Sequence, residues 1–276
     1  MYSKWACCFG LRRLIRVLKR MVNGALGCVG LRLVRTDSHQ GTTADLGLRQ
    51  ILDRLKVSMV FDVGAHIGEY ATRLRQIGYQ ARIISFEPRA DAFSELSARA
   101  MSDPNWEVQR LALGDREGEQ LLNISRNLVS SSFLPTLPNI LTVEPAIAGI
   151  GTERVKVEVL DRIYRNLTDP SELKIFLKID AQGYEPAVLA GAREFLSYCV
   201  AVQLELALLP SYQSQTLLPE MIGLMRKKGF ELVYLERGFW DERTGYLVEA
   251  DGIFVRAEML ERDFPHSMIT DSLPSN

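Results

Sequence analysis

The sequence predicts an α/β protein with a doubly wound, mainly parallel sheet. Short apolar runs alternate with helical patterns along the chain, a glycine-containing turn follows the first of these runs, and acidic residues end several others. Strands that alternate with helices are joined by right-handed crossovers, so they are parallel and carry helices on both faces of one sheet. With 276 residues, of which 47% are hydrophobic, the chain supports a substantial core, which excludes disorder as its dominant state.

The individual elements follow from hydrophobic periodicity, taken in chain order. Residues 46–56 have the apolar spacing of a helix that follows a polar joint. Short apolar runs predict strands at residues 59–61, 81–86, 106–113, 175–179, 200–206, 231–235 and 252–255. Apolar residues at helical spacing predict helices at residues 69–76, 90–100, 186–195 and 216–228. The order is therefore strand, helix, strand, helix through most of the chain.

The alternation is interrupted midway along the chain. Residues 119–124 and 155–160 have the composition of strands, and prolines, glycines and a run of three serines lie between them. We therefore expect an irregular insertion at about residues 125–152. Loops of this length are usually functional, so the insertion is a candidate lid over a binding site; a disordered loop is the alternative. The predicted domain comprises residues 44–256, and residues 257–276 have the composition of a polar tail.

The first 36 residues carry eight basic residues and no acidic one, although the whole chain has 33 basic and 34 acidic residues. On a helical wheel, residues 11–22 place apolar side chains on one side and basic side chains on the other, which predicts a basic amphipathic helix. The uncharged stretch at residues 21–31 is shorter than the roughly 20 residues that span a bilayer. Two interpretations are open: the helix packs on the main domain, or it makes peripheral contact with a membrane surface. A transit peptide is a third.

Charge and cysteine content exclude several other classes. A net charge of −1 argues against a generally basic, nucleic-acid-binding protein. The four cysteines include no C-x-x-C pair, so neither a disulfide scaffold nor a structural zinc site is indicated. We expect a reducing cytoplasmic compartment, with peripheral contact at the inner face of a membrane as one alternative, and no bound metal ion.

The first predicted strand runs into a glycine-containing turn at residues 60–68, where an open α/β sheet binds its ligand. Gly64 can adopt backbone angles closed to other residues, and Gly68 permits a close approach of the next helix to a strand or ligand. The next strand ends at Glu87, 19 residues after Gly68, where such folds place an acid that accepts hydrogen bonds from ribose hydroxyls. His66 stands where a nicotinamide fingerprint needs glycine, which disfavours dinucleotide binding.

Two further acids end later strands. Asp180 closes the predicted fourth core strand and is followed by Gly183, and Glu205 closes the strand after it. Together with Glu87 they put three acids at three successive strand ends, which predicts an acidic crevice for a cationic ligand. The structural alternatives are helix capping and, for Asp180, an ion pair with Lys178.

Three blocks of sequence resemble the FkbM family of S-adenosylmethionine-dependent methyltransferases: residues 62–70, the Phe-Glu-Pro step at 86–88, and residues 178–192. The third block is the most specific, because it combines a lysine-flanked strand, an acid, a glycine and a distinctive helix. The resemblance covers about residues 56–256 and implies a Rossmann-like class I sheet whose last strand is antiparallel. It also implies S-adenosylmethionine as cofactor and O-methylation of a hydroxyl on a sugar, glycolipid or secondary metabolite. The departures from the family pattern are His66, Ala71 and Gln182.

The resemblance implies a role in cofactor binding for the residues at the strand ends. Asp62 would face the amino acid end of the cofactor, residues 64–68 would let it lie close to the backbone, and Glu87 would hold its ribose hydroxyls. Residues 113–115, after the third strand, would flank the adenine. The expected cofactor-binding residues are Asp62, Gly64, Ala65, His66, Gly68, Tyr70, Glu87, Pro88, Leu113, Gly114, Asp115 and Asp180.

Methyl transfer to a hydroxyl oxygen would proceed by in-line displacement, aided by a general base. Asp180, Glu205 and His66 are the candidate bases, and their spacing does not choose between them. Tyr184 and Tyr212 are candidates to border the pocket for a small-molecule or glycan acceptor. The alternative functions are a nicotinamide-dependent oxidoreductase and a catalytically silent, membrane-associated binding protein.

We predict that the basic helix of residues 11–22 adds affinity for anionic vesicles. The affinity should fall as salt is raised, because salt screens the attraction between basic side chains and lipid headgroups. Vesicle sedimentation of the full chain and of a chain that begins at Thr36 measures this contribution. Equal sedimentation of the two chains would leave only the packed-helix interpretation.

Overall fold

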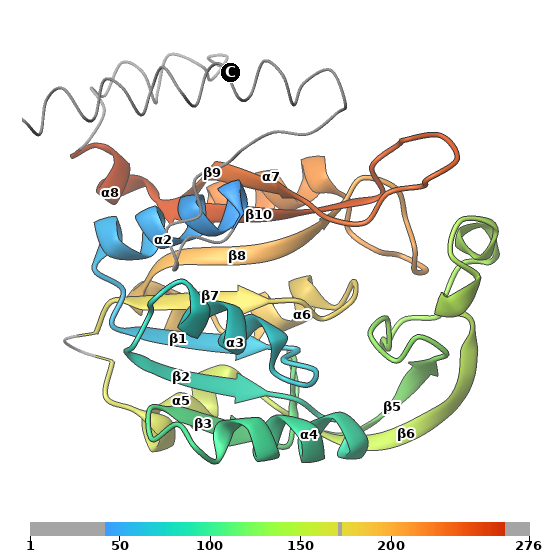
Figure 1. Cartoon of the computed structure of the whole chain (residues 1–276), viewed down its shortest axis with the longest axis horizontal. Helices are drawn as coiled ribbons and strands as arrows, with labels where there is room; N and C mark the ends of the chain where they lie inside the picture. The colour runs from blue at the N-terminus through green and yellow to red at the C-terminus, as the bar shows by residue number, and fades with distance from the viewer. Residues whose placement is uncertain (1–41, 171–172, 263–276) are drawn as a thin grey trace, which may run out of the picture. The chain divides into compact units, whose positions relative to one another are not determined.

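A computed structural model describes residues 42–170 and 173–262 of the protein (Figure 1). The predicted basic helix at residues 11–22 and the part of the polar tail after residue 262 lie outside the described residues. In the described parts, one seven-stranded sheet has the order β3-β2-β1-β7-β8-β10-β9. Its strands are β1 (Met59–Val63), β2 (Arg82–Phe86), β3 (Trp106–Gln109), β7 (Ile175–Ile179), β8 (Cys199–Ala207), β9 (Phe230–Arg237) and β10 (Glu249–Arg256).

The sheet is mainly parallel, as predicted. Strand β1 pairs in parallel with β2 and β7, β2 pairs in parallel with β3, and β7 with β8. The last strand, β10, is antiparallel to both β8 and β9. All five residues of β1 and of β7 are buried, as is typical of central strands covered on both faces. The prediction of a doubly wound sheet with an antiparallel last strand is therefore confirmed.

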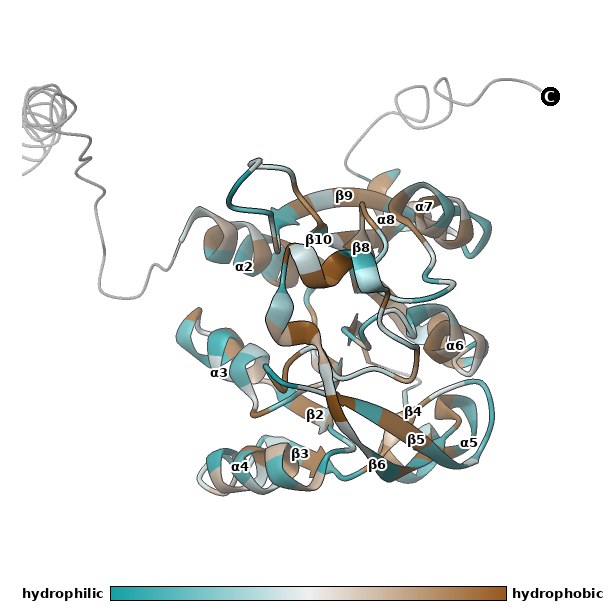
Figure 2. Cartoon of the chain, turned by 90° about the vertical axis from the view of Figure 1, so that its right-hand side faces the viewer, coloured by the Kyte–Doolittle hydropathy of each residue, from teal (hydrophilic) through white to brown (hydrophobic). Residues whose placement is uncertain are grey.

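Helices cover both faces of this sheet (Figure 2). On one face lie α2 (Thr43–Leu55), α3 (Glu69–Gln76) and α4 (Ala90–Ala100); on the other lie α5 (Leu160–Leu167), α6 (Glu185–Ala190) and α7 (Leu218–Lys227). A short helix, α8 (Ala257–Leu260), follows β10. Because successive side chains of a strand point to opposite faces, each face has its own apolar cluster, with Phe61 on the α5–α7 side and Phe176 on the α2–α4 side.

The segment that interrupts the alternation forms a second, three-stranded sheet. Its strands are β4 (Ala112–Leu113), β5 (Gly118–Ser125) and β6 (Gly149–Glu158), with β6 between the other two. Residues 126–148 connect β5 to β6 and contain the short 3₁₀ helices η1 (Pro138–Thr142) and η2 (Pro145–Ile147). Ile140 and Ile147 pack there against Tyr212 and Val248. The irregular part of the insertion is thus shorter than expected, because β6 begins at Gly149, and it has a small apolar cluster of its own.

Three predicted elements differ from the structure by more than a few terminal residues. The predicted strand at 106–113 is split, because β3 and β4 belong to different sheets. The predicted strand at 155–160 ends at residue 158, and α5 begins at Leu160, whose side chain is buried with that of Tyr164. The helix predicted at 186–195 ends at Ala190, and residues 195–198 form the 3₁₀ helix η3 (Phe195–Tyr198) instead.

Within the ranges that the structure describes, no helix has the length and apolar content needed to cross a membrane.

The turn after β1 places a strict steric demand on Gly64. This residue has a φ of 73°, and a Cβ atom there would lie 1.8 Å from the backbone oxygen of Asp180. We predict that Gly64→Ala lowers the free energy of unfolding by roughly 2–5 kcal/mol, through backbone strain and overpacking. Urea denaturation followed by circular dichroism measures this loss.

Gly223→Ala is the matched control for this substitution. Gly223 lies in α7, and a Cβ atom there would meet nothing within 4 Å. Alanine has the higher helix propensity, so this variant should be as stable as the unchanged protein or more stable by up to about 1 kcal/mol. Indistinguishable denaturation midpoints for the two variants would contradict the close contact between Gly64 and Asp180.

Candidate active site

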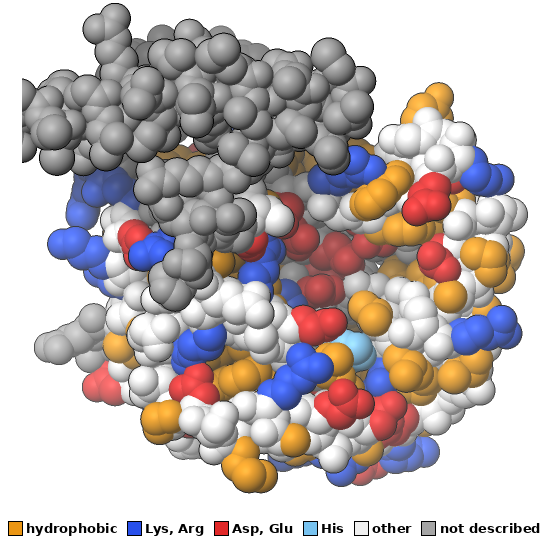
Figure 3. Space-filling model, in the orientation of Figure 1, with side chains coloured by type: hydrophobic (Ala, Val, Ile, Leu, Met, Phe, Trp, Pro, Cys, Tyr) orange, Lys and Arg blue, Asp and Glu red, His pale blue; other side chains and the backbone are white. Residues whose placement is uncertain are grey.

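A pocket of about 320 Å³ lies at the carboxyl ends of the central strands. Its walls come from the β1–α3 turn, the end of β2, the β7–α6 turn, β8, β10 and the insertion. Figure 3 shows the hollow on this face of the molecule, with acidic side chains gathered around it. This is the edge of the sheet at which the sequence places the ligand.

Most of the predicted site residues line this pocket, and five do not. The predicted residues in its wall are Gly64, Ala65, His66, Tyr70, Glu87, Pro88, Leu113 and Asp180. Those outside its wall are Asp62, Gly68, Gly114, Asp115 and Glu205. Three of these five, Asp62, Gly68 and Glu205, contact other parts of the protein around the pocket.

Asp62 is fully buried beneath the pocket and does not face it, contrary to our expectation. It lies on the α3 face of the sheet, and parallel register places it beside Ser85 of β2 and Lys178 of β7. The Ser85 hydroxyl donates a hydrogen bond to Asp62 Oδ2 (3.0 Å), and Lys178 Nζ lies 3.2 Å from Asp62 Oδ1. Asp62 therefore balances the charge of a buried lysine.

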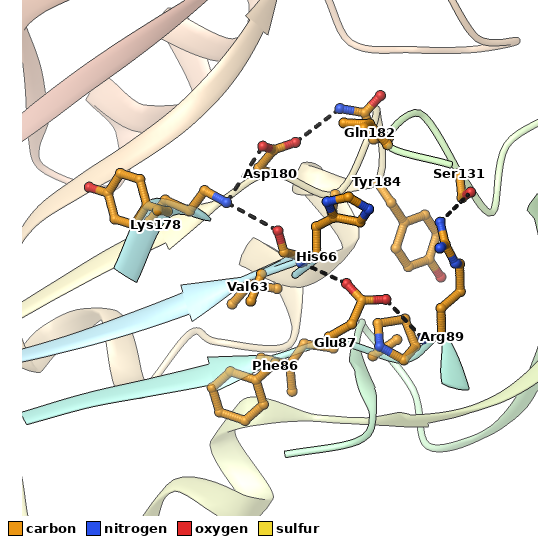
Figure 4. Close-up of a pocket in the computed structure, with 18 of the residues that line it drawn as sticks. Val63, His66, Phe86, Glu87, Arg89, Ser131, Lys178, Asp180, Gln182 and Tyr184 are labelled. Atoms are coloured by element: carbon orange, nitrogen blue, oxygen red, sulfur yellow. Dashed lines mark hydrogen bonds and ion pairs between the residues drawn. The ribbon is translucent and has the colours of Figure 1, made fainter. Parts of the chain in front are cut away.

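Lys178 is buried, with its ammonium group at the floor of the pocket (Figure 4). Besides the contact with Asp62, its Nζ donates to the backbone oxygen of Gly64 (3.2 Å) and lies 3.5 Å from Asp180 Oδ2. The Tyr70 ring is 5.3 Å from the same nitrogen. Burial disfavours the ammonium form, but Asp62 and Asp180 outweigh burial and raise the pKa of Lys178 above its ordinary value. The group is thus a permanent cation at neutral pH.

Glu87 joins the end of β2 to the glycine-containing turn. Its Oε2 accepts a hydrogen bond from the backbone amide of His66 (2.9 Å), and its Oε1 accepts one from that of Arg89 (2.9 Å; Figure 4). Burial raises the pKa of Glu87, while the two amide hydrogen bonds oppose that effect. Each carboxylate oxygen retains a lone pair, so Glu87 can still accept hydrogen bonds from hydroxyl groups in the pocket.

His66 and Gly68 shape the turn in different ways. His66 has a φ of 48°, and its Nδ1 lies 3.3 Å from Glu69 Oε2 at the start of α3. Gly68 has a φ of 87°, and a Cβ atom there would lie 2.7 Å from the Trp106 ring. Of the two alternatives that the sequence left open for Gly68, a close approach to a strand or to a ligand, the structure shows the first, because Gly68 packs against Trp106 of β3.

Gln182 connects two of the predicted candidate bases. Its side-chain amide nitrogen donates to Asp180 Oδ1 (2.9 Å) and to Glu205 Oε1 (3.0 Å). Burial raises the pKa of Glu205, and the nearby Glu249 and Asp180 raise it further. Asp180 is 35% exposed and lines the pocket, whereas Glu205 lies behind Gln182. Of the three candidates, Asp180 and His66 can reach a ligand in the pocket.

The insertion forms one wall of the pocket and is tied to β2 through Arg89. The Arg89 guanidinium is buried, pairs with Asp91 through two contacts of 2.9 Å, and donates to the backbone oxygen of Leu128 and to Ser131 Oγ. Val129 and Phe133 add apolar surface to the same wall. Residues 128–133 therefore lie over the end of β2 as part of the pocket wall, and their role as a lid stays a prediction.

Several pocket residues were not assigned to the site by sequence reasoning. Lys178 was considered only as an ion-pair partner of Asp180, although a charged residue inside a buried strand was a usable signal. Asp251 of β10 also lines the pocket and was not assigned to the site. Burial and the charge of Asp180 raise its pKa to about 6. Gln203 accepts a hydrogen bond from the Tyr70 hydroxyl (2.7 Å) and carries no charge that could have distinguished it. Other polar pocket residues that were not assigned to the site include Glu69, Arg73, Arg89, Ser131 and Gln182.

The two tyrosines that were candidates to border the pocket lie at different depths. Tyr184 lines the pocket and contacts the Phe133 ring at a centroid distance of 4.8 Å. Tyr212 is fully buried and donates to Gln182 Oε1 (2.7 Å), so it acts behind the wall. In the part of the chain that the structure describes, no group of three or more His, Cys, Asp or Glu side chains is arranged to hold a metal ion.

Comparison with protein families gives one match: the model of the "Methyltransferase FkbM domain" matches residues 62–232. A search of curated proteins gives no match.

Among solved structures, the chain is similar to fibrillarin from Aeropyrum pernix in complex with natively bound S-adenosyl-L-methionine. The identity is 12%, the coverage 77% of this chain and 73% of that one, and the TM-score 0.45. Magnesium protoporphyrin IX methyltransferase from Synechocystis PCC 6803 with bound SAM is 12% identical to this chain, with a TM-score of 0.38. The match covers 79% of this chain and 86% of that one. A putative S-adenosylmethionine-dependent methyltransferase from Listeria monocytogenes is 8% identical to this chain, with a TM-score of 0.45. The match covers 78% of this chain and 99% of that one.

Proposed function

The chain belongs to the FkbM methyltransferase family, and from this premise we propose that it transfers the methyl group of S-adenosylmethionine to a hydroxyl oxygen of a small-molecule or glycan acceptor. The observation that carries the proposal is the position of Asp180. Its carboxylate is partly exposed in the same pocket as Glu87 and is held by contacts with Lys178 and Gln182. A carboxylate fixed in this way can accept the proton of an acceptor hydroxyl.

The residues of the pocket fit the parts of S-adenosylmethionine. Glu87 has free lone pairs for the two ribose hydroxyls, and Pro88 and Leu113 offer apolar surface for the adenine. The backbone of residues 64–66 borders the pocket beside Lys178, whose charge suits the carboxylate of the cofactor's amino acid end. Asp180 suits its positive sulfonium. When bound, S-adenosylmethionine supplies an electrophilic methyl group.

In the proposed reaction, the acceptor hydroxyl oxygen forms the new bond to the methyl carbon while the carbon–sulfur bond breaks, and the hydroxyl proton leaves. Asp180 accepts this proton and, being partly exposed, returns it to solvent. Alignment of the reacting atoms can supply up to about 7–11 kcal/mol of barrier reduction in favourable systems, and a positioned base adds about 10²–10⁴-fold. His66 is the second candidate base, because it also lines the pocket.

Charge supports a neutral or cationic acceptor. The chain has a net charge of −1, and the three basic residues of the pocket wall, Arg73, Arg89 and Lys178, are each paired with an acidic side chain, so a polyanion such as nucleic acid is disfavoured. The basic residues among the first 36 support a cytoplasmic site of action with peripheral contact at a membrane. Comparing metabolites and glycans by mass spectrometry in cells with and without the protein would identify the acceptor.

We predict that Glu87→Ala weakens the binding of S-adenosylmethionine by about 1–3 kcal/mol, because the variant lacks the acceptor for the ribose hydroxyls. Isothermal titration calorimetry measures the change. Glu153→Ala is the matched control: its carboxylate also accepts a hydrogen bond from a backbone amide, that of Ala90 (3.1 Å), but it lies outside the pocket wall. Equal affinities for the two variants would refute the ribose assignment. Titration of the unchanged protein with NAD tests the oxidoreductase alternative.

We also predict that Asp180→Asn lowers turnover by about 10²-fold or more with a modest change in cofactor affinity, since asparagine keeps the shape and loses the basic group. Single-turnover methyl transfer from labelled S-adenosylmethionine, melting temperature and cofactor affinity are measured on one preparation. If Asp180 served only as an ion-pair partner of Lys178, stability would fall and the rate per folded molecule would persist. A stable, cofactor-saturated variant with near-normal turnover would move the base assignment to His66 or show that the reaction needs no general base.

A further inference from the structure

Gln182 occupies a conformation that the surrounding residues hold firmly. It lies in the turn between β7 and α6 with a φ of 53°, in the left-handed region, and its side chain is buried. The hydroxyl of Ser132, in the insertion, donates to its backbone oxygen (2.6 Å). Gln182 is thus fixed at the junction of the β7–α6 turn and the insertion, and its side chain points to the two strand-end acids.

The hydrogen bonds determine which way the Gln182 amide faces. Its nitrogen has two hydrogens and two carboxylate neighbours, Asp180 at 2.9 Å and Glu205 at 3.0 and 3.1 Å. Its oxygen accepts from the hydroxyl of Tyr212 (2.7 Å). The reversed amide would place its carbonyl oxygen against two carboxylates, so this orientation is strongly favoured. Every polar atom of the side chain has a partner.

Asp180 stands among many ionisable groups, most of them acidic. Burial raises the pKa of Glu205, Glu249 and Asp251, and nearby carboxylates raise it further, so the neutral form of each acid is favoured relative to that of a free carboxyl group. The ionisable groups around Asp180 are Lys178 of β7, Asp62 of β1, His66 of the β1–α3 turn, Tyr70 of α3, Glu185 of α6, Glu205 of β8, Tyr212 before α7, and Glu249 and Asp251 of β10.

We propose that Gln182 is the positioning residue for Asp180: as an uncharged bridge that donates to both Asp180 and Glu205, it favours the carboxylate form of Asp180 as any hydrogen-bond donor does, and it orients that carboxylate toward the pocket. The inference deepens the proposed function, since it rests on Asp180 being the base. Lys178 and Gln182 act on different oxygens of the carboxylate, Oδ2 and Oδ1, so together they fix its plane. Each oxygen keeps a lone pair for an acceptor hydroxyl.

The proposal makes the residue type at this position decisive. A glutamate of the same size would place a third carboxylate between Asp180 and Glu205, and the three groups would share a proton. Like charges in one site raise the pKa of at least one member strongly. A methionine would keep approximately the volume but leave both carboxylates without their common donor, so Asp180 would lose one of its two stabilising contacts.

The test follows the ionisation of Asp180 directly and needs no acceptor. Protein labelled with ¹³C at the aspartate carboxyl carbons is titrated by NMR, and the Asp180 signal is the one lost in Asp180→Asn. We expect Gln182→Glu to raise the pH midpoint of this signal by about 1 or more, and Gln182→Met to raise it by a smaller amount. The control is Gln203→Glu, which adds an acid to the pocket wall beside Tyr70 and Asp251. It should move the midpoint by much less.

Circular dichroism confirms that each variant is folded, and either Gln182 variant suffices if the other does not fold. An Asp180 midpoint that stays at the unchanged value in a folded Gln182 variant overturns the proposal, as does an equal rise in Gln203→Glu. Once the acceptor is identified, the acidic limb of the kcat/KM profile of Gln182→Glu should also move to higher pH. A merely structural role would lower the melting temperature and leave that profile in place.

The outcome is separable from that of the proposed function. Calorimetry of the unchanged protein with S-adenosylmethionine decides cofactor binding, whereas the NMR titration uses the protein alone. If the protein did not bind the cofactor, the proposed reaction would be refuted. The NMR titration would still show whether Gln182 affects the ionisation of Asp180.

Discussion

The site depends on a buried row of polar side chains that crosses the central strands in register. Ser85, Asp62, Lys178 and Gln203 stand on neighbouring strands β2, β1, β7 and β8, all on the α3 face of the sheet. A buried ammonium group is tolerated only with paired charge and hydrogen bonds, and removing one partner of such a pair costs about 3–5 kcal/mol. Lys178 meets this demand through Asp62, Asp180 and the Gly64 carbonyl oxygen, so its charge ties the strand ends to the turns that form the pocket.

The fold could largely be predicted because its core elements have strong local periodicity. Residues 69–76, 90–100 and 175–179 form elements with the predicted bounds, and the alternation of types predicted the parallel sheet. The elements that were missed depend on distant contacts. Helix α5 was not predicted because its stability comes from Leu160 and Tyr164 packing in the main core, where Tyr164 meets the Phe195 ring. No local pattern identifies such a partner.

The sequence predicted where the site lies in the sheet, but it did not predict how the side chains of the site are arranged. Strand-end position identified Glu87 and Asp180 as pocket residues, because the carboxyl ends of parallel strands meet at one edge. Sequence position cannot tell which strand-end groups are covered by neighbouring elements, and this is why Asp62 was expected to face the ligand while it lies beneath the floor. It also cannot tell a glycine that approaches a ligand from one, such as Gly68, that approaches a tryptophan.

The way the insertion is attached has a consequence for how this pocket can diversify. The insertion is fixed at Ser132, whose hydroxyl donates to the backbone oxygen of Gln182, while Val129, between β5 and this anchor, is 55% exposed. The proposed cofactor contacts come from segments outside the insertion, namely residues 64–66 and 87–88, Leu113, Lys178 and Asp180. If the proposed function holds, acceptor selectivity and cofactor binding would depend on different segments, and changes at positions such as Val129 would offer a route to new acceptors without altering the residues at the strand ends.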